Sequence, residues 1–388
     1  MNFEITKKLL LTQSALTFVL LSCLQLSTWL PLRFWSAWGG GNYLDTWQIL
    51  RYAKCYEEVG LSVYENSGTT CSSYLYGRTL LQALSFFGLD TSATQLIGYT
   101  FLAILAIGLS LVFPVQSKRD SITFMLVVCS PPVMLLADRG NFDIVIFFVL
   151  ILVAKLTALR KFYSAYILLT ITVLMKFYTA PVFLLIILLS KLPREKIFGA
   201  ILLLISVVFS LRDIAITQTK YPSGSDAQFG FTVWGEYLNK YSSTQVNIYE
   251  KYFISIIVFS VIVFLTYFII RTRLHTPLSV TQTYTWQFIG FWIFLIVSVS
   301  CYFAGMNFDY RLIFFAATIL LASKLLVGVQ PHTQTSYLIG MLWLSYPSGG
   351  LQPIGDLAIE VAIACTAVIL VLEVKRNFRK YLRMNRPQ

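Results

Sequence analysis

Long apolar blocks run through the whole sequence and limit what it can fold into. Hydrophobic residues make up 57% of the 388 positions and charged residues only 12%, whereas a soluble domain carries roughly 25% charge. A chain so poor in charge lacks the side chains to cover its surface in water. Many blocks approach the roughly 20 residues that an α-helix needs to cross a bilayer. The pattern predicts an all-α membrane protein and not a β-barrel, whose strands alternate over about ten residues.

The blocks predict a polytopic bundle of about twelve transmembrane helices in a single domain over 1–388. The first block follows two lysines, as in a signal peptide, but it is long and has no small-residue cleavage site. We therefore expect an uncleaved first helix. The predicted spans are 9–30, 93–114, 122–137, 142–158, 162–177, 180–192, 197–211, 252–270, 286–303, 311–328, 336–347 and 357–373.

Basic residues concentrate on one side of this predicted topology. An even number of spans puts both termini on one side, and most of the 30 Lys and Arg residues fall there. Short cytoplasmic loops are rich in Lys and Arg, so we expect cytoplasmic termini. The net charge of +12 is then a topology signal and not a sign of nucleic-acid binding. The residues are Lys7, Lys8, Lys118, Arg119, Lys155, Arg160, Lys161, Lys191, Arg194, Lys196, Arg271, Arg273, Lys324, Lys375, Arg376, Arg379, Lys380, Arg383 and Arg386.

Two long segments, 31–92 and 213–251, are expected on the external side. Within the first, 45–59 and 74–87 predict amphipathic helices that lie in the plane of the membrane interface. Tryptophans in this segment fit the aromatic belt of a membrane; they are Trp35, Trp38 and Trp47. The second helix has its apolar residues on one side, at Leu80, Leu81, Leu84 and Phe87.

Cys55 and Cys71 both lie in the first external segment, in a compartment that permits disulfides. A bridge between them would close a loop of about 16 residues and stabilise the fold by roughly 3 kcal/mol. Two unpaired thiols are the alternative. The other cysteines fall in or near predicted spans, where we interpret them as packing residues.

Asp45 follows the glycine-rich run 39–42 and opens the first interfacial helix. A carboxylate at the membrane surface can accept the proton of a hydroxyl group as its oxygen attacks a sugar. Asp45 is therefore a candidate general base. An ordinary helix N-cap is the alternative, because an Asp side chain also satisfies free N–H groups at a helix start.

Further ionisable residues fall at the expected external ends of spans, where such residues are functional candidates. Arg139, Asn141 and Asp143 share one turn and could bind an anion or a sugar hydroxyl. A turn with an internal salt bridge is the alternative. Lys176 ends a span against the positive-inside trend, and it is either a phosphate ligand or a lysine that snorkels to the interface.

Two more groups lie at the same level. Asp309, Tyr310 and Arg311 precede the tenth span, where Arg311 could bind phosphate with its planar fork or form a simple ion pair with Asp309. Arg78 begins the second interfacial helix. It is a cation candidate for the same site or a snorkelling arginine.

The sequence argues against a nucleotide-sugar donor, because it has no Asp-x-Asp motif and no glycine-rich phosphate loop. The two histidines, His275 and His332, fall in expected cytoplasmic loops, so we expect no external zinc site. Cations gathered on the external side would instead stabilise the negative charge on a leaving phosphate.

Three short motifs resemble those of a known group of membrane enzymes. The first is Asp45-x10-Tyr56 followed by Gly60-x3-Tyr64. The second is the turn Arg139-Gly140-Asn141-x-Asp143, and the third is Lys176-x4-Pro181. A first external loop with an early Asp and two interfacial helices looks like the GT-C superfamily of glycosyltransferases. The motifs are most similar to glycosyltransferase family 87, which includes polyprenol-phosphate mannosyltransferases, and the stretch 310–312 is compatible with it.

The resemblance implies a GT-C-like bundle and an inverting transfer from a polyprenyl-phosphate sugar to a lipid or glycan acceptor at the external membrane face. By similarity Asp45 is the catalytic base. The donor phosphate would be bound by Lys176, Arg139, Arg311 and Arg78, and the sugar or acceptor by Asn141, Asp143, Asp309 and Tyr310. No second acidic residue adjoins Asp45, so we expect no metal and no cofactor.

Two other functions remain open. A polymerase or ligase of lipid-linked glycans also places cations and large loops outside, but it does not need an interfacial Asp after the first span. A transporter or flippase should carry paired charges or broken helices at mid-membrane, and the sequence shows few of them.

Overall fold

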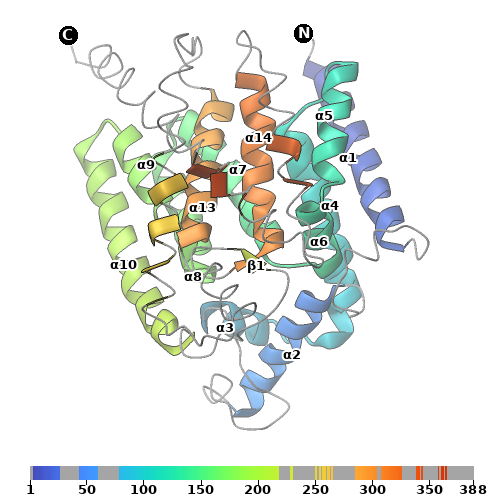
Figure 1. Cartoon of the computed structure of the whole chain (residues 1–388). Coiled ribbons are helices and arrows are strands. Elements are labelled where there is room, and N and C mark those ends of the chain that lie inside the picture. Colours follow the sequence, from blue (N-terminus) through green and yellow to red (C-terminus); the bar gives the residue numbers. More distant parts are fainter. Residues whose placement is uncertain are drawn as a thin grey trace, which may run out of the picture.

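A computed structural model of the chain describes residues 3–26, 43–59, 78–217, 228–229, 285–303 and 307–325, with scattered positions at 250–264 and 338–364. These residues are almost wholly helical (Figure 1), which confirms the all-α expectation for this part of the chain. The one strand pair among them, β1 with β2, is antiparallel. The elements are α1 (Phe3–Leu26), α2 (Leu44–Val59), α3 (Arg78–Phe86), η3 (Thr91–Ala93), α4 (Thr94–Val112), α5 (Lys118–Val128), α6 (Pro131–Arg139), α7 (Asp143–Ala158), α8 (Phe162–Met175), η4 (Phe177–Thr179), α9 (Val182–Leu189), α10 (Pro193–Thr217), β1 (Gln228–Phe229), α13 (Trp286–Phe303), β2 (Asn307–Phe308), η6 (Asp309–Leu312) and α14 (Ile313–Leu325).

Two of the described helices are long and apolar enough to cross a membrane, Thr91–Val112 and Trp286–Phe303. The pair α5 and α6 passes the same test together, although the two are bent by 58° at their junction. Phe162–Met175, Phe177–Leu189 and Ile313–Lys324 are apolar but shorter. These helices agree with a membrane protein, and the larger number of spans stays a prediction.

The predicted span over 122–137 is a bent pair of helices in the structure. α5 ends at Val128, and α6 begins at Pro131, which is followed by Pro132. Proline has no N–H group and suits the first turn of a helix but not its interior. The buried hydroxyl of Ser130, between the two helices, donates to the carbonyl of Val127 at 2.6 Å. The proline pair therefore redirects the chain, and α6 carries Arg139 away from the axis of α5.

Helix α7 packs against α4, α8 and α13 (Figure 1). Helix α7 has Asp143 at its start and Lys155 near its end, and every residue between these two is apolar. A helix that is apolar all round is buried on all sides, so α7 forms the centre on which the other helices pack.

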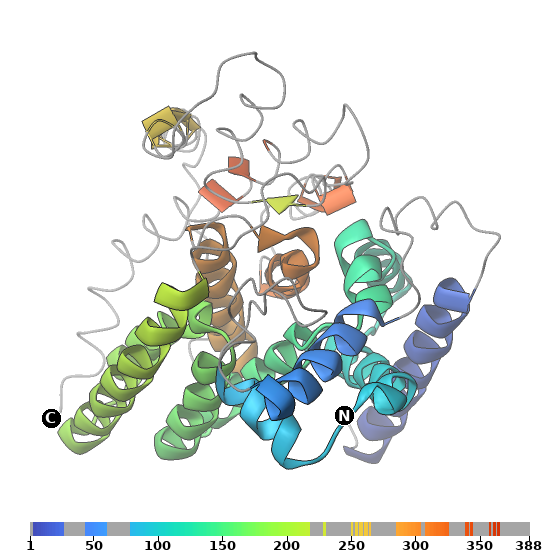
Figure 2. The ribbon, with the colours of Figure 1, turned by 90° about the horizontal axis from the view of Figure 1, so that it is seen from below.

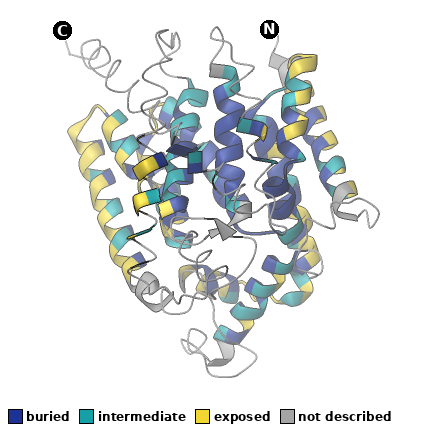
Figure 3. Cartoon of the chain, viewed as in Figure 1, coloured by how far each residue is buried: buried dark blue, intermediate teal, exposed yellow. Residues whose placement is uncertain are grey.

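Helix α10 lies at the edge of the bundle and turns an apolar stripe outward (Figure 3). The stripe repeats every three or four residues and is 51% to 65% exposed, at Ile197, Ile201, Leu204, Val208 and Leu211. An exposed apolar surface of this kind marks a face that meets lipid or a partner. The stripe supports a membrane environment for this side of the bundle.

Antiparallel packing brings the ends of three helices together. A short turn joins α7 to α8, so the start of α7 lies beside the end of α8. Lys155 Nζ lies 5.2 Å from the ring centroid of Trp286, which places the end of α7 at the start of α13. The far end of α13 and the following η6 therefore return to the start of α7. Asp143, Lys176 and Arg311 belong to this common end.

The basic turns lie at the opposite end of the bundle. Lys324, in the last turn of α14, forms an ion pair of 2.8 Å with Asp120 in the first turn of α5. Lys118 and Arg119 precede Asp120 directly. Because α14 returns alongside α13, it runs parallel to α7, and Lys324 lies at the same end as Lys155. The described helices thus separate these cations from the end that holds Asp143.

Helices α2 and α3 lie side by side across the end of the bundle that holds Asp143 (Figures 1 and 2). Helix α2 buries Leu50 and Ala53 and exposes Trp47, which agrees with the amphipathic helix predicted over 45–59. In α3 the three leucines are buried, but Phe87 is 70% exposed, so its expected place on the same side is wrong. The helix ends at Phe86, and the chain turns away at Gly88, whose φ is 60°. Trp35, Trp38, residues 74–77 and most of 213–251 lie outside the described residues.

The tight pair of predicted helices at 162–177 and 180–192 is present as α8 and α9. The ring of Tyr166, near the start of α8, stacks on Phe183 at 5.8 Å. Its hydroxyl lies 2.8 Å from that of Ser190, which caps the end of α9. The chain therefore reverses between α8 and α9. Helix α10 approaches the Tyr166 ring closely through Gly199.

We predict that Gly199→Ala destabilises the bundle, because an added Cβ would lie 2.5 Å from Cζ of the fully buried Tyr166. Overpacking of this kind costs about 1–3 kcal/mol, measured as a lower midpoint of thermal unfolding in detergent. Gly340→Ala is the matched control, since nothing lies within 4 Å of its added Cβ. Equal midpoints for the two variants would contradict the close contact between α8 and α10.

Candidate functional site

Asp45 lies in the first turn of α2, and the residue Tyr43 fixes the position of that turn. Tyr43 has a positive φ of 63°, is 1% exposed, and donates its N–H to the carbonyl of Asp138 at 2.7 Å. Its ring lies so close to α4 that a Cβ on Gly98 would be 2.2 Å away. A non-glycine residue persists in this conformation only where its surroundings hold it there. The start of α2 is therefore held against α4 and α6.

The carboxylate of Asp45, 3% exposed, is bound by one side chain at the end of α6 and one in the turn between α6 and α7. Arg139 forms an ion pair with Oδ1, and Asn141 Nδ2 donates to Oδ2 at 2.6 Å. These contacts differ from the N-cap alternative, in which the carboxylate would accept from the backbone of α2. Both contacts also join Asp45 of α2 to a different segment of the chain. They therefore differ from the second alternative, in which a salt bridge would form within the turn itself.

Gly140 allows the turn to point its side chains in two directions. It is the left-handed C-cap of α6, with φ of 57°, a conformation that glycine adopts without strain. A Cβ there would lie 2.8 Å from Thr46 Oγ1, and Thr46 donates this hydroxyl to the Gly140 carbonyl. After this turn Asn141 faces Asp45, while Asp143 begins α7 and faces the bundle.

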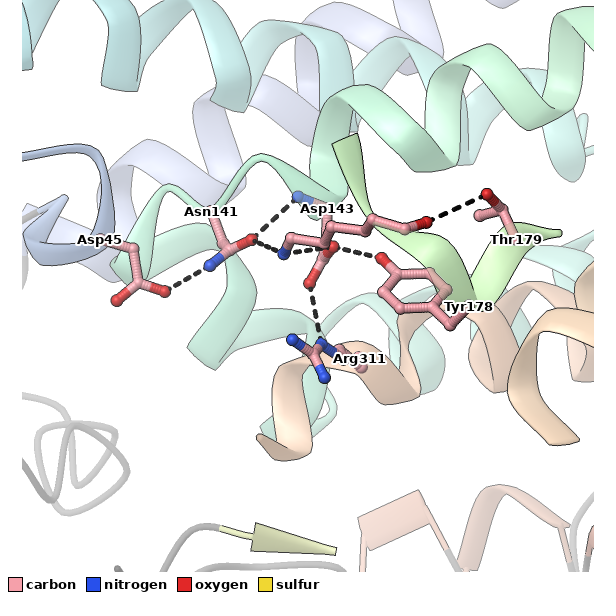
Figure 4. A network of polar contacts seen from close by, with 7 residues as sticks. Asp45, Asn141, Asp143, Tyr178, Thr179 and Arg311 are labelled. Carbon is pink, nitrogen blue, oxygen red and sulfur yellow. Dashed lines mark hydrogen bonds and ion pairs between the residues drawn. The ribbon is translucent and has the colours of Figure 1, made fainter. Parts of the chain in front are cut away.

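Asp143 is fully buried and binds groups from three other segments (Figure 4). Its Oδ1 accepts from Lys176 Nζ at 2.7 Å and from the hydroxyl of Tyr178. Its Oδ2 lies 3.5 Å from Arg311 Nε. A buried charge is tolerated when it is paired and hydrogen-bonded, and a negative charge is also stabilised at the start of a helix. Asp143 thus links α7 to the end of α8, to η4 and to η6.

Lys176 caps the end of α8 and is 7% exposed. Its amine donates to Asp143 and, at 2.9 Å, to Asn141 Oδ1, so it points into the protein and not toward the interface as a snorkelling lysine would. Thr179 Oγ1 donates to the Lys176 carbonyl at 3.2 Å and steadies the turn that follows (Figure 4).

We call the connected set of side chains the polar network; its members are Asp45, Arg139, Asn141, Asp143, Lys176, Tyr178 and Arg311. It holds three cations and two carboxylates, so its ionised form carries a net positive charge. It combines a carboxylate that can accept a proton with cations that can bind an anion. Both abilities lie at the end of the bundle away from the basic turns.

The sequence identified six of these seven residues but missed Tyr178. Its hydroxyl donates to Asp143, and the guanidinium carbon of Arg311 lies 5.4 Å from its ring centroid. Pro181 was the available signal, because it directly precedes α9 and so limits the short turn after Lys176 that carries Tyr178.

Other predicted site residues are not brought together by the described part of the chain. The side chains of Arg78, Asp309 and Tyr310 lie outside it, as does Cys71. Cys55 is disulfide-bonded, so the alternative of an unpaired thiol at Cys55 is wrong. Its pairing with Cys71 stays a prediction.

Within the described ranges no group of three or more His, Cys, Asp or Glu side chains is placed to hold a metal ion. Each carboxylate of the polar network is already bound to a cation of the protein.

Comparison of the chain with protein-family models, with curated proteins and with solved structures finds no match. The similarity to glycosyltransferase family 87 therefore stays a prediction from short motifs. Five residues of those motifs, Asp45, Arg139, Asn141, Asp143 and Lys176, belong to the polar network.

We predict that Asp143→Ala lowers the free energy of unfolding by about 3–5 kcal/mol, because it leaves the buried Lys176 and Arg311 without their carboxylate. Asp120→Ala is the matched control, since it removes an ion pair whose side chains are 19% and 27% exposed and should cost about 1 kcal/mol or less. Thermal unfolding of both purified variants measures the difference. Similar losses would contradict a central role for Asp143.

Proposed function

We propose that the protein is a polytopic membrane glycosyltransferase that transfers a sugar from a polyprenyl-phosphate donor to a lipid or glycan acceptor at the external face of the membrane. The observation that carries the proposal is the polar network, in which the carboxylate of Asp45, in the first turn of α2, is joined through Asn141 to Lys176 at the end of α8 and onward to Arg311 of η6. Ionisable side chains in membrane-embedded sequence are expensive and usually serve function.

Two observations support the proposed orientation. The basic turns around Lys118, Lys155 and Lys324 lie at the end opposite the polar network, as expected if that end is cytoplasmic. Cys55 on α2 is disulfide-bonded, as expected if the other end faces an oxidising compartment. With about twelve spans, both termini would be cytoplasmic.

The proposed reaction is an inverting displacement at the anomeric carbon of the sugar. The hydroxyl oxygen of the acceptor attacks this carbon and gives its proton to Asp45. The bond from the carbon to the phosphate oxygen breaks, and the polyprenyl phosphate leaves with the electron pair. Lys176 and Arg311, with Arg139 nearby, stabilise the negative charge that grows on the phosphate. These residues require no metal or cofactor for the transfer.

We predict that Asp45→Asn lowers the turnover of transfer by about 10²–10⁴-fold, because the amide keeps the shape of the carboxylate but cannot accept the proton. The assay follows radiolabelled sugar from polyprenyl-phosphate donors into lipid and glycan acceptors in membranes. Asp90→Asn is the control, because Asp90 is exposed and its carboxylate accepts hydrogen bonds from Ser92, two residues on in the chain. Wild-type turnover in Asp45→Asn would remove the proposed base.

A second prediction concerns the donor phosphate. Arg311→Ala should raise the donor KM by about tenfold or more, because a charge-assisted hydrogen bond to the phosphate is lost. Lys324→Ala is the matched control, since Arg311 precedes α14 and Lys324 lies in its last turn, paired with Asp120 at the other end. The transfer rate at increasing concentrations of a polyprenyl-phosphate sugar gives the donor KM of both variants. Unchanged donor KM and turnover in folded Arg311→Ala would show that the phosphate binds elsewhere.

A further inference from the structure

We infer that Asn141 is a positioning residue that joins the proton-accepting carboxylate of Asp45 to the phosphate-binding amine of Lys176; this inference rests on the proposed function. Asn141 is 0% exposed and contacts both side chains directly (Figure 4). It lies in the turn before α7 and would not itself touch the reacting atoms.

The contacts of Asn141 allow only one orientation of its amide. Oδ1 lies 2.9 Å from Lys176 Nζ and 2.9 Å from the backbone N of Asp143. Both of these groups can only donate a hydrogen bond, so the oxygen must face them. The Nδ2 group is thereby directed at Asp45 Oδ2, 2.6 Å away, which accepts its hydrogen. The two halves of one side chain therefore serve the two halves of the site.

This arrangement fixes the distance between the base and the phosphate ligand. Asp143, whose backbone N–H holds the amide, is the first residue of α7. Asn141 and Arg139 each take one oxygen of Asp45, so the carboxylate cannot rotate without breaking a contact. A base and a leaving group held in fixed geometry account for a large part of the rate of a displacement reaction. The chain achieves this with one amide between them.

The charges around Asp45 determine how an acid at position 141 would act. Asp138 and Arg139 come from α6, Lys176 from the end of α8, and Asp143 lies behind Asn141 at the start of α7. Helix α4 contributes no charged side chain. An added carboxylate at position 141 would therefore be the negative charge closest to Asp45.

The variant Asn141→Asp separates the two halves of the amide. It keeps the shape and can still accept from Lys176 and from the backbone of Asp143, but it cannot donate to an ionised Asp45. We expect the donor KM to change little and turnover at saturating donor to fall by about 10²-fold. The midpoint of the acidic limb of the pH–rate profile should move to higher pH by about one pH unit, because neighbouring carboxylates oppose each other's ionisation. A role in stability alone would not move that limb.

A folded Asn141→Asp protein with wild-type turnover and an unmoved acidic limb would overturn the inference. Asn141→Ala is the second variant, in case the added charge prevents folding. It should lower turnover to a similar extent and leave the limb in place, and full activity in the folded Ala variant would also overturn the inference. The double variant Asp45→Asn with Asn141→Asp restores the hydrogen bond with its direction reversed. The double variant should unfold at a higher temperature than either single variant and should stay inactive.

The single variant Asp45→Asn distinguishes this inference from the proposed function. If Asp45→Asn is inactive while both Asn141 variants are fully active, the base is correct and only the role of Asn141 is wrong. If Asp45→Asn transfers sugar at the wild-type rate, the proposed base itself is wrong.

Discussion

The buried charge of Asp143 is the constraint on which the described structure depends. A carboxylate without water must be surrounded by donors, and this one draws Lys176, Tyr178 and Arg311 from three segments to the start of α7. Replacement of a whole buried ion pair or triad by apolar side chains of similar volume is often neutral or stabilising in proteins, although loss of one partner alone is not. Stability alone therefore does not account for the cluster, and the proposed binding of a phosphate gives a reason for keeping the cations together.

The broad architecture follows from the sequence because apolar run length is a local property. The runs predicted helices at α4, α7, α8 and α13, and apolar positions three or four residues apart predicted the amphipathic α2. The bend between α5 and α6 depends on two adjacent prolines within one apolar run. Hydropathy does not register them, so the apolar run predicted a span there but not the bend within it.

The site was predicted as a set of residues but not as a set of contacts. Ionisable groups at helix ends stand out in an apolar sequence, which is why Asp45, Lys176 and Arg311 were identified. Their partners depend on tertiary packing: Arg139 reaches Asp45 of a distant helix, and Asn141 lies between the two carboxylates. Tyr178 was missed because an aromatic residue in an aromatic-rich membrane protein carries no signal until its hydroxyl is placed.

The hairpin of α7 and α8 has a consequence for how the chain enters a membrane. Asp143 and Lys176 lie at its open end and neutralise each other, so the two helices can partition into lipid as one unit without carrying an isolated charge. Arg311 comes much later in the chain and joins a carboxylate that already has a partner. Biogenesis can therefore proceed from a locally neutral pair, and the net positive character of the network arises only when the last helices assemble.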